Sequence, residues 1–487
     1  MTGSPLSRLV FALVVVTCAY FVQGGGDNEN SRYALVRSIV ERGTFRIDAY
    51  RRSTLDIATF DGHWYSDKSP GFSFVAAAPY ALGARIAQPS DDVDPQPFAL
   101  HLVTLATCGL AAAFAAVALL DVLVRLGVSR VAALLAVLGW IFGTNAFAYA
   151  TMFYSHQFAA SLLVLAFAAL HRELPAAAGF ATGVAVISEL TVAPLALLVA
   201  AFALSKLGWR CALRFAVASL PPVVVLALYN ASCFGSPLHV GYQSLADPYF
   251  EQGMSHLFGF GAPNVEVMGM MLASQFRGLL PVSPFLVLAV PGWYVMLRAR
   301  QTRVLGAACV LGFVGMLVLL SGYAFWWGGS SFGSRHFVPA LPLLVIPVAF
   351  AIDRMRRSWL RGVAIALVAA SIAICTVCVG IQPELFDAHM KKGPAPELPI
   401  ADPRQPLSDT IWPLFRLGYV SNKATFHSRF KYAANEPGHD ADAYNLGELL
   451  GLDGTNSFLP LVAIWAAFGF AIVRRLRIMA ASEPAAR

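Results

Sequence analysis

Charged residues are scarce in this sequence of 487 residues: Asp, Glu, Lys and Arg make up 13% of it, against about 25% in soluble proteins. Hydrophobic residues reach 57%, above the soluble average of about 45–50%. Polar low-complexity tracts are absent from the sequence, which excludes disordered and collagen-like classes. The seven cysteines are too dispersed for a disulfide-stapled scaffold. This composition predicts a polytopic membrane protein.

Motifs for nucleotides and metal ions are also missing from the sequence. It contains no Walker motif, no GxGxxG turn after a strand and no HExxH pair. His239 and His256 have no carboxylate or cysteine at ligand spacing, so they give only weak support for a metal site. We therefore expect neither ATP nor a nucleotide sugar as a substrate. The energy for a reaction outside the cytoplasm would have to arrive with a lipid-borne substrate.

Long apolar runs are what the sequence has instead, and a helix needs roughly 20 apolar residues to cross a membrane. About twelve crossings fit, at residues 6–22, 98–124, 131–151, 157–170, 175–188, 190–204, 212–229, 279–296, 304–321, 337–352, 360–380 and 458–473. Residues 71–87 are expected to form a re-entrant or juxtamembrane helix, because a crossing there would reverse every later segment. Residues 175–204 are expected to form a hairpin of short helices that turns at Glu189. An ionisable residue there is a candidate for function, with a packing role as the alternative.

Lysine and arginine clusters give the orientation of these spans. The short connections that hold them all fall on one side, together with Arg8 and Arg487, as the positive-inside rule requires. That side holds 18 of the 35 basic residues and only four acids, so its net charge is about +14 and that of the rest about −7. Both termini are therefore expected in the cytoplasm. The overall charge of +7 follows from topology and does not call for a nucleic-acid partner.

Four segments are expected on the outer side: residues 23–97, 230–278, 322–336 and 381–457. We expect residues 1–380 to form the catalytic membrane module, 381–457 a loop or small cap, and 458–487 the last span with a cytoplasmic tail. In the first outer segment, Asn30 or Ser31 is a natural N-cap and Gly43 a natural residue after the helix end. This pattern predicts an amphipathic helix that lies on the outer leaflet.

Acidic and basic residues are concentrated around this predicted helix. Asp27 and Glu29 lie just before it, where the helix dipole favours an ionised carboxylate that can accept a proton from a hydroxyl; either acid could instead be only a cap. Lys68 is suited to hold a phosphate near the headgroups, unless it only neutralises Asp67 or extends to the lipid surface. Arg335, at the mouth of a span, could clamp a phosphate or diphosphate or merely anchor an aromatic belt.

The order of these features resembles the bacterial GT-C glycosyltransferases. It is most similar to the family 39-like enzymes, which include the aminoarabinose transferase acting on lipid A and the protein O-mannosyltransferases. In their pattern a carboxylate precedes Arg by three residues and Tyr by four, which here selects Glu29, Arg32 and Tyr33. Further matching segments are Asp67-Lys68-Ser69-Pro70, Asn230, Phe234-Gly235-Ser236-Pro237, Gly241-Tyr242, Phe332-Gly333-Ser334-Arg335, Pro339 and Pro342. Ser69 stands where the family has a proline, and Asn30 where a second acid is usual.

The resemblance implies an all-α GT-C-like bundle of about twelve spans in the bacterial inner membrane, with its active site on the outer face. The donor would be a polyprenyl phosphate sugar with its phosphate near Lys68, Arg32 and Arg335. A carboxylate, in the order of preference Glu29, Asp27 and Asp56, would take the proton of the acceptor hydroxyl during inverting transfer. We expect further substrate contacts from Tyr33, Tyr65, Asp67, His156, Glu189 and Tyr242.

The expected partners are the lipid-linked donor, membrane lipids, and a glycolipid, glycan or protein acceptor of the cell envelope, without nucleotides or nucleic acid. No cofactor is assigned, and a divalent cation stays open. A transporter or flippase of a lipid-linked sugar is the alternative, because Glu189 and the broken helix pair also suit a substrate pathway. A scaffold role would explain the topology but not the concentration of Asp27, Glu29, Arg32 and Lys68.

Overall fold

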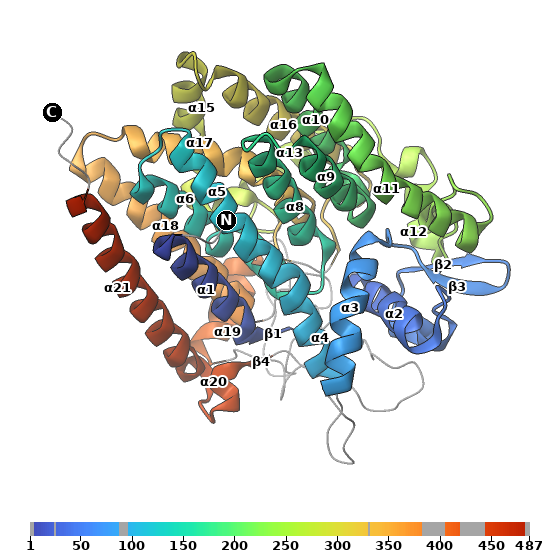
Figure 1. Ribbon diagram of the computed structural model, residues 1–487. Helices are drawn as coiled ribbons and strands as arrows, with labels where there is room; N and C mark the ends of the chain where they lie inside the picture. Colours follow the sequence, from blue (N-terminus) through green and yellow to red (C-terminus); the bar gives the residue numbers. More distant parts are fainter. Residues whose placement is uncertain are drawn as a thin grey trace.

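The computed structural model describes residues 4–23, 26–86, 96–329, 332–381, 405–418 and 444–482. Within these ranges the chain is a bundle of helices with two antiparallel pairs of short strands (Figure 1). The predicted all-α polytopic class is confirmed. Most of the predicted segment 381–457 falls outside the described residues.

Among the residues that the structure describes, six helices are long and apolar enough to cross a membrane: Phe98–Arg125, Leu190–Leu207, Trp209–Phe234, Arg303–Ser321, Ser358–Ile381 and Gly454–Ala481. Five shorter apolar helices accompany them: Pro5–Tyr20, Arg130–Phe142, Ser155–Leu170, Pro175–Ser188 and Pro284–Arg298. Each of the eleven overlaps one predicted span. The twelfth predicted span coincides with a 3-10 turn at Arg335–Ala340 and helix α17, Pro342–Arg354. The number of twelve crossings stays a prediction.

The helices of the bundle, with bounds as the structure has them, are α1 Pro5–Tyr20, α4 Gln96–Thr104, α5 Leu110–Arg125, α6 Arg130–Phe142, α7 Ala146–Thr151, α8 Ser155–Leu170, α9 Pro175–Ser188, α10 Ala193–Leu207, α11 Trp209–Phe234, α14 Leu279–Val282, α15 Ala289–Arg298, α16 Arg303–Ser321, α17 Pro342–Arg354, α18 Ser358–Ile381 and α21 Leu459–Ser482. The hairpin predicted to turn at Glu189 is confirmed in its first half, because α9 ends at Ser188. Glu189 has extended backbone angles, and α10 follows after one 3-10 turn. Its carboxylate therefore lies at a break in the helix rather than along one.

Two predicted spans are interrupted for local chemical reasons. The span predicted at 131–151 is divided into α6 and α7. Between them the Thr144 hydroxyl donates to the carbonyl of Trp140 at 2.6 Å and accepts from the amide of Ala146 at 3.1 Å, so it competes with the main-chain helix bonds. The span predicted at 279–296 is divided into α14, a 3-10 turn and α15. Pro284 begins that turn and supplies no amide hydrogen.

Three of the predicted outer segments are joined to one another. The first contains α2 (Asp27–Arg42), strands β2 (Ile57–Phe60) and β3 (His63–Ser66), and α3 (Gly71–Ile86), which Figure 1 shows at one end of the bundle. The second contains α12 (Pro248–Met254) and α13 (Val265–Ala273). An isolated bridge pairs Ala58 with Leu245, and another pairs Phe260 with Tyr323. Main-chain bonds thus connect residues 23–97, 230–278 and 322–336.

The strands β1 (Phe21–Val22) and β4 (Tyr444–Asn445) also pair, and they connect the end of α1 to the short helix α20 (Leu446–Leu449). A further short helix, α19 (Trp412–Arg416), packs near α18. The hairpin of β2 and β3 turns at Asp61 and Gly62, which both have positive φ, as a type I′ turn requires.

Several basic connections that we expect in the cytoplasm also meet. The Asp121 carboxylate accepts from Arg125 Nε at 2.9 Å and from Arg172 Nη2 at 2.7 Å. The amide of Ser129 donates to Asp353 Oδ1 at 2.9 Å. The connection after α5 therefore contacts the end of α8 and the end of α17. Three of the predicted inner connections are thus in contact with one another.

Helix α2 differs from its prediction. It ends at Gly43 (φ +63°) as expected, but it begins at Asp27, and its N-cap Gly26 lies four or five residues before the predicted N-cap. Every residue from Asn28 to Ser38 is buried, because α3 and β3 pack against it. Over this stretch the helix is enclosed by other parts of the protein, so it lacks the exposed polar face that the predicted amphipathic surface helix requires. The Ser31 hydroxyl even bonds inward, to Asp56 O at 2.6 Å and Ser66 Oγ at 2.7 Å.

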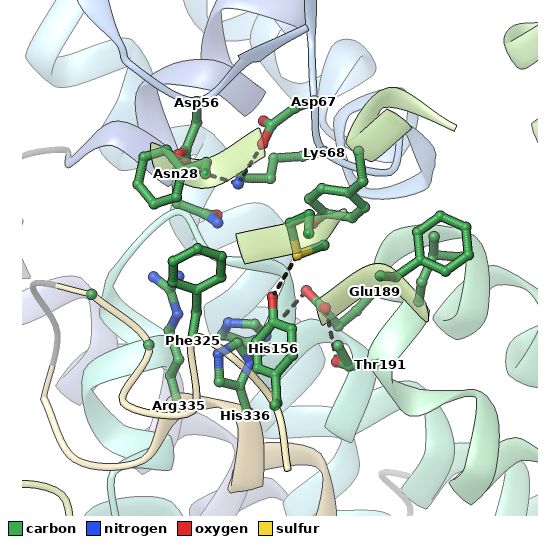
Figure 2. A pocket seen from close by; sticks show the side chains of 18 of the residues that line it. Asn28, Asp56, Asp67, Lys68, His156, Glu189, Thr191, Phe325, Arg335 and His336 are labelled. Atoms are coloured by element: carbon green, nitrogen blue, oxygen red, sulfur yellow. Dashed lines mark hydrogen bonds and ion pairs between the residues drawn. The ribbon is translucent and has the colours of Figure 1, made fainter. Parts of the chain in front are cut away.

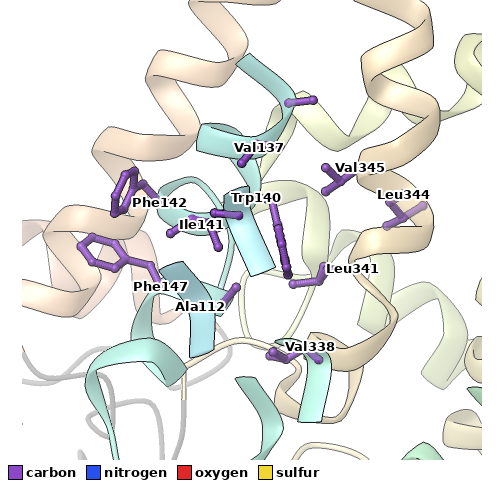
Figure 3. Close-up of a cluster of buried hydrophobic side chains, with 14 of the residues drawn as sticks. Ala112, Val137, Trp140, Ile141, Phe142, Phe147, Val338, Leu341, Leu344 and Val345 are labelled. Carbon is purple, nitrogen blue, oxygen red and sulfur yellow. The ribbon is translucent and has the colours of Figure 1, made fainter. Parts of the chain in front are cut away.

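The apolar core lies where α5, α6, α7 and α17 meet (Figure 3). Trp140 at its centre is fully buried, and the side chains around it include Ala112, Val137, Phe147 and Leu341. Because interiors are close-packed, this core fixes the start of α17 and with it the segment just before, which includes Arg335.

Candidate functional site

A cavity of about 800 Å³ lies between the joined outer segments and the break at Glu189. Eight predicted site residues line it: Asp27, Asp56, Asp67, Lys68, His156, Glu189, Tyr242 and Arg335. Figure 2 shows the Lys68 group on one side of this cavity and Arg335 and the two histidines on the other. Four predicted site residues do not line it: Glu29, Arg32, Tyr33 and Tyr65. The rest of the wall is mostly aromatic and aliphatic, with side chains from the second and third joined segments.

Lys68 lies between two carboxylates. Its ammonium is 2.8 Å from Asp56 Oδ2 and 2.8 Å from Asp67 Oδ2, and all three side chains are buried. The neighbouring carboxylates hold the pKa of Lys68 above its ordinary value even though burial opposes this. Burial, with the charge of Asp56 adding to it, raises the pKa of Asp67 to about 6 although Lys68 lowers it. The ammonium thus stays charged and is already paired within the protein.

Tight packing holds this group in place. A Cβ on Gly241 would lie 2.8 Å from Asp67 Cα, so only glycine lets the second outer segment come this close. The next residue, Tyr242, places its ring centre 5.5 Å from Lys68 Nζ, within reach of a cation–π contact. Asp56 and Asp67 already have a cation between them and are not an open metal site. Among the described residues, no group of three or more His, Cys, Asp or Glu side chains could hold a metal ion.

The two acids at the start of α2 have different surroundings. Glu29 is 1% exposed, and its two carboxylate oxygens accept from the amides of Gly26 at 3.0 Å and Phe153 at 2.6 Å. It caps its own helix and fastens the segment before α8. Asp27 lines the cavity and is half-buried, with Oδ1 accepting from the amide of Leu55 at 2.6 Å. The geometry favours Asp27 over Glu29 as the acid that meets a substrate, the reverse of the predicted order.

Arg32 is also bound within the protein. Its guanidinium donates to Asn28 Oδ1 at 3.0 Å, to the carbonyls of Ser69 and Ser188 at 3.2 and 3.3 Å, and to Glu189 Oε2 at 3.4 Å. With 1% exposure it lies behind the cavity wall. Glu189 in turn accepts from the hydroxyls of Ser155 at 2.6 Å and Thr191 at 2.8 Å. Arg32 therefore positions Glu189 and is left out of the phosphate site proposed below.

The predicted tyrosines lie in different places. Tyr33 packs edge-on against Tyr80 and Phe153, with ring centres 5.5 and 6.0 Å away, and is 1% exposed. Tyr65 packs against Phe234 at 5.4 Å and is also buried. They belong to two separate hydrophobic clusters beside the first outer segment, whereas Tyr242 lines the cavity.

Arg335 is the cavity-lining cation with unused hydrogen-bonding capacity. Its Nε is buried and has no hydrogen-bond partner among the residues that the structure describes. Its guanidinium lies over the ring of Tyr154, 5.5 Å from the centre. Gly328 backs it closely, because a Cβ there would lie 2.9 Å from Arg335 Cγ. A planar guanidinium in a cavity is suited to bind a phosphate through two parallel bonds.

Sequence reasoning missed much of the wall. His336 and Thr191 line the cavity, as do the aromatic side chains Tyr154, Tyr249, Phe250, Phe258, Phe260, Tyr323, Phe325 and Trp327. The aromatic residues of 322–336 looked like an interfacial belt, and only the fold turns them toward the cavity. For His336, the one signal in the sequence was its position directly after Arg335.

No protein-family model matches the sequence, and no curated protein matches it. Two solved structures are similar to it: the crystal structures of ArnT from Cupriavidus metallidurans in the apo state and bound to undecaprenyl phosphate. Each has a TM-score of 0.47 and covers 77% of this chain, with 15% and 14% identity respectively. The match spans 63% of the ArnT chain. The predicted GT-C resemblance is thus met by a likeness of fold alone, from which no activity follows.

Proposed function

We propose that the protein transfers a sugar from a polyprenyl-phosphate-linked donor to an acceptor of the cell envelope. The observation that carries this proposal is the buried Arg335 guanidinium, unpaired at Nε, in a cavity with apolar and aromatic walls. A phosphate would complete its hydrogen bonding, and the aromatic wall would accept an isoprenoid chain. Carboxylates line the same cavity, as a transfer to a hydroxyl requires.

In the proposed reaction, the acceptor hydroxyl oxygen attacks the anomeric carbon while the bond from that carbon to the phosphate oxygen breaks. Asp27 takes the hydroxyl proton, since the start of α2 favours its ionised form. Arg335 stabilises the negative charge on the departing polyprenyl phosphate. Attack from the face opposite the phosphate inverts the anomeric centre. Lys68 acts as the counter-ion of Asp56 and Asp67 rather than as a second phosphate ligand.

We propose that the cavity opens to the outer face of the bacterial inner membrane. The joined segments that build it hold more acidic than basic residues, whereas three of the arginine-bearing connections meet one another elsewhere. The positive-inside rule assigns the latter to the cytoplasm. The acceptor would be a glycolipid, glycan or protein of the envelope, and neither a nucleotide nor a nucleic acid takes part.

The test is the pair of variants Asp27→Asn and Glu29→Gln in cells that lack the chromosomal copy. Mass spectrometry of envelope glycolipids and glycoproteins would name the product, and its amount would be divided by the amount of folded protein. Loss of the general base should lower the product about 10²- to 10⁴-fold in Asp27→Asn. Glu29→Gln should keep most activity per folded molecule but cost about 1–3 kcal/mol of stability, because one main-chain amide loses its acceptor.

Full product from Asp27→Asn would contradict the role given to this residue. A gene deletion that leaves every envelope glycan and glycolipid unchanged would contradict the proposed function itself. A transporter of the same lipid would instead leave the sugar on its carrier and alter only its distribution between the two leaflets.

A further inference from the structure

Two histidines share one end of the cavity. His156 lies in the first turn of α8 and His336 in the 3-10 turn before α17, and their ring centres are 5.5 Å apart in an edge-on arrangement. Both line the cavity and are more than nine-tenths buried. Figure 2 shows them between Arg335 and Glu189. They come from distant parts of the chain, so their pairing is a product of the fold.

Both rings have unused hydrogen-bonding capacity. Neither ring nitrogen of His336, nor Nε2 of His156, has a hydrogen-bond partner within the described part of the chain. Nδ1 of His156 lies 3.1 Å from Glu189 Oε2. Buried polar atoms without partners are rare because burial removes the water that would otherwise bind them. An outside ligand is the natural partner for a pair of such rings at a cavity wall.

The surroundings of His336 favour its neutral form. Burial and the charges of Arg335 and His156 lower the pKa of His336 well below its usual value, and the opposing effects of Glu189 and the Phe325 main chain do not offset them. A neutral imidazole has one donor and one acceptor nitrogen. That pattern matches a hydroxyl group, which also donates and accepts, and it does not match a phosphate, which only accepts.

We propose that His156 and His336 form a subsite that binds hydroxyl groups of the transferred sugar. This inference rests on the proposed function, because the position of Arg335 fixes which part of the donor lies there. With the phosphate on Arg335, its two substituents are the sugar and the isoprenoid chain. The adjacent His336 offers polar ring nitrogens that suit the sugar, whereas the aromatic and aliphatic wall suits the chain. His336 can donate to one sugar oxygen and accept from another, while His156 accepts at Nε2 when its proton faces Glu189.

The experiment measures binding rather than transfer, by native mass spectrometry of the full chain in detergent. The probes are undecaprenyl phosphate and undecaprenyl phosphate carrying glucose, mannose, galactose or arabinose. The wild type should bind at least one glycosylated lipid about tenfold more tightly than the bare lipid, as expected for hydrogen bonds to buried partners. His336→Phe should reduce the ratio of the two affinities to about threefold or less.

His336→Gln serves as the conservative variant, because its amide also offers a donor and an acceptor. It should recover part of the preference that His336→Phe loses. A wild type that binds bare and glycosylated lipids equally would overturn the sugar subsite and leave the proposed function standing. Equal weakening of both lipids in His336→Phe would assign the residue a structural role and also overturn the subsite. Failure of the wild type to bind any of the lipids would overturn the proposed function.

Discussion

The two sides of the cavity use their charges in opposite ways. On one side, which we name the carboxylate wall (Asp56, Lys68 and Asp67), both carboxylates lie 2.8 Å from the ammonium. On the other, the guanidinium wall (Arg335 and His336), buried nitrogens have no partner among the described residues. A charge that is paired inside the protein contributes to the fold. A buried polar group without a partner indicates where a ligand binds.

A second arginine shows how the guanidinium wall keeps its shape. Arg277 is fully buried and donates to three carbonyls, those of Phe276 at 2.9 Å, Trp327 at 2.6 Å and Gly329 at 2.6 Å. Two of these carbonyls flank Gly328, which packs against Arg335. Arg277 thus fixes the loop, and Arg335 projects from it.

The largest effect is expected from breaking the carboxylate wall. Lys68→Met leaves two buried carboxylates side by side without their cation, which should lower the free energy of unfolding by about 3–5 kcal/mol. The triple variant Asp56→Asn/Lys68→Met/Asp67→Asn removes the whole charged group and should recover most of that loss. Thermal unfolding in detergent measures both. Wild-type stability in Lys68→Met, combined with lost lipid binding, would make Lys68 a ligand group and erase the contrast between the walls.

Arg277→Lys should have the next largest effect. The lysine ammonium lacks the planar fork of donors with which the guanidinium binds several carbonyls at once. The free energy of unfolding should therefore fall by about 1–3 kcal/mol. The affinity for undecaprenyl phosphate should fall as well, because the loop that carries Gly328 loosens. Unchanged stability and unchanged affinity would show that the loop does not depend on Arg277.

The raised pKa of Asp67 predicts a pH dependence of stability. Its folded pKa of about 6 exceeds the ordinary value, so the folded state binds this proton more tightly than the unfolded state does. The resulting stabilisation is present at low pH and is lost as the pH rises through about 6. Asp67→Asn should reduce the change of the thermal unfolding midpoint with pH between about pH 4 and 6. The same slope in wild type and variant would assign the titration to another group.

The smallest effect is expected from moving the guanidinium without removing it. Gly328→Ala would place a Cβ 2.9 Å from Arg335 Cγ and should weaken lipid binding about two- to fivefold, a small fraction of a lost charged hydrogen bond. Gly329→Ala is the matched control, since Gly329 also has a positive φ (+69°) but no atom within 4 Å of such a Cβ. Both variants share the backbone strain, so a difference between them isolates Arg335. Equal affinities in the two variants would remove the role given to Gly328.

Sequence patterns predicted the positions of the apolar helices well, because membrane thickness directly constrains the length of an apolar run, while the number of crossings stays a prediction. They also predicted the helix end at Gly43 and the break at Glu189. They placed Glu29 before Asp27, whereas in the structure Asp27 lines the cavity and Glu29 does not, and the reason is geometric. In a helix of 3.6 residues per turn, positions two apart point about 200° from each other, so one acid lines the cavity and the other caps the interior.

The fold also determines which basic side chains are available to bind a ligand. A motif that contains Lys68 and Arg32 shows that positive charge is present but not whether Asp56, Asp67 and Glu189 already bind it. Likewise, His156 and His336 are 180 positions apart in the chain, and no local pattern brings them together. Pairing across the chain depends on packing, which composition and spacing do not specify.

The affinity of the purified full chain for undecaprenyl phosphate, measured for wild type, Arg335→Ala and the exposed control Arg52→Ala, tests the central claim most directly. Loss of charged hydrogen bonds to the phosphate should weaken binding about 10- to 100-fold in Arg335→Ala. Arg52→Ala should bind like the wild type. An Arg335→Ala variant that binds undecaprenyl phosphate as tightly as the wild type would contradict the phosphate site at Arg335.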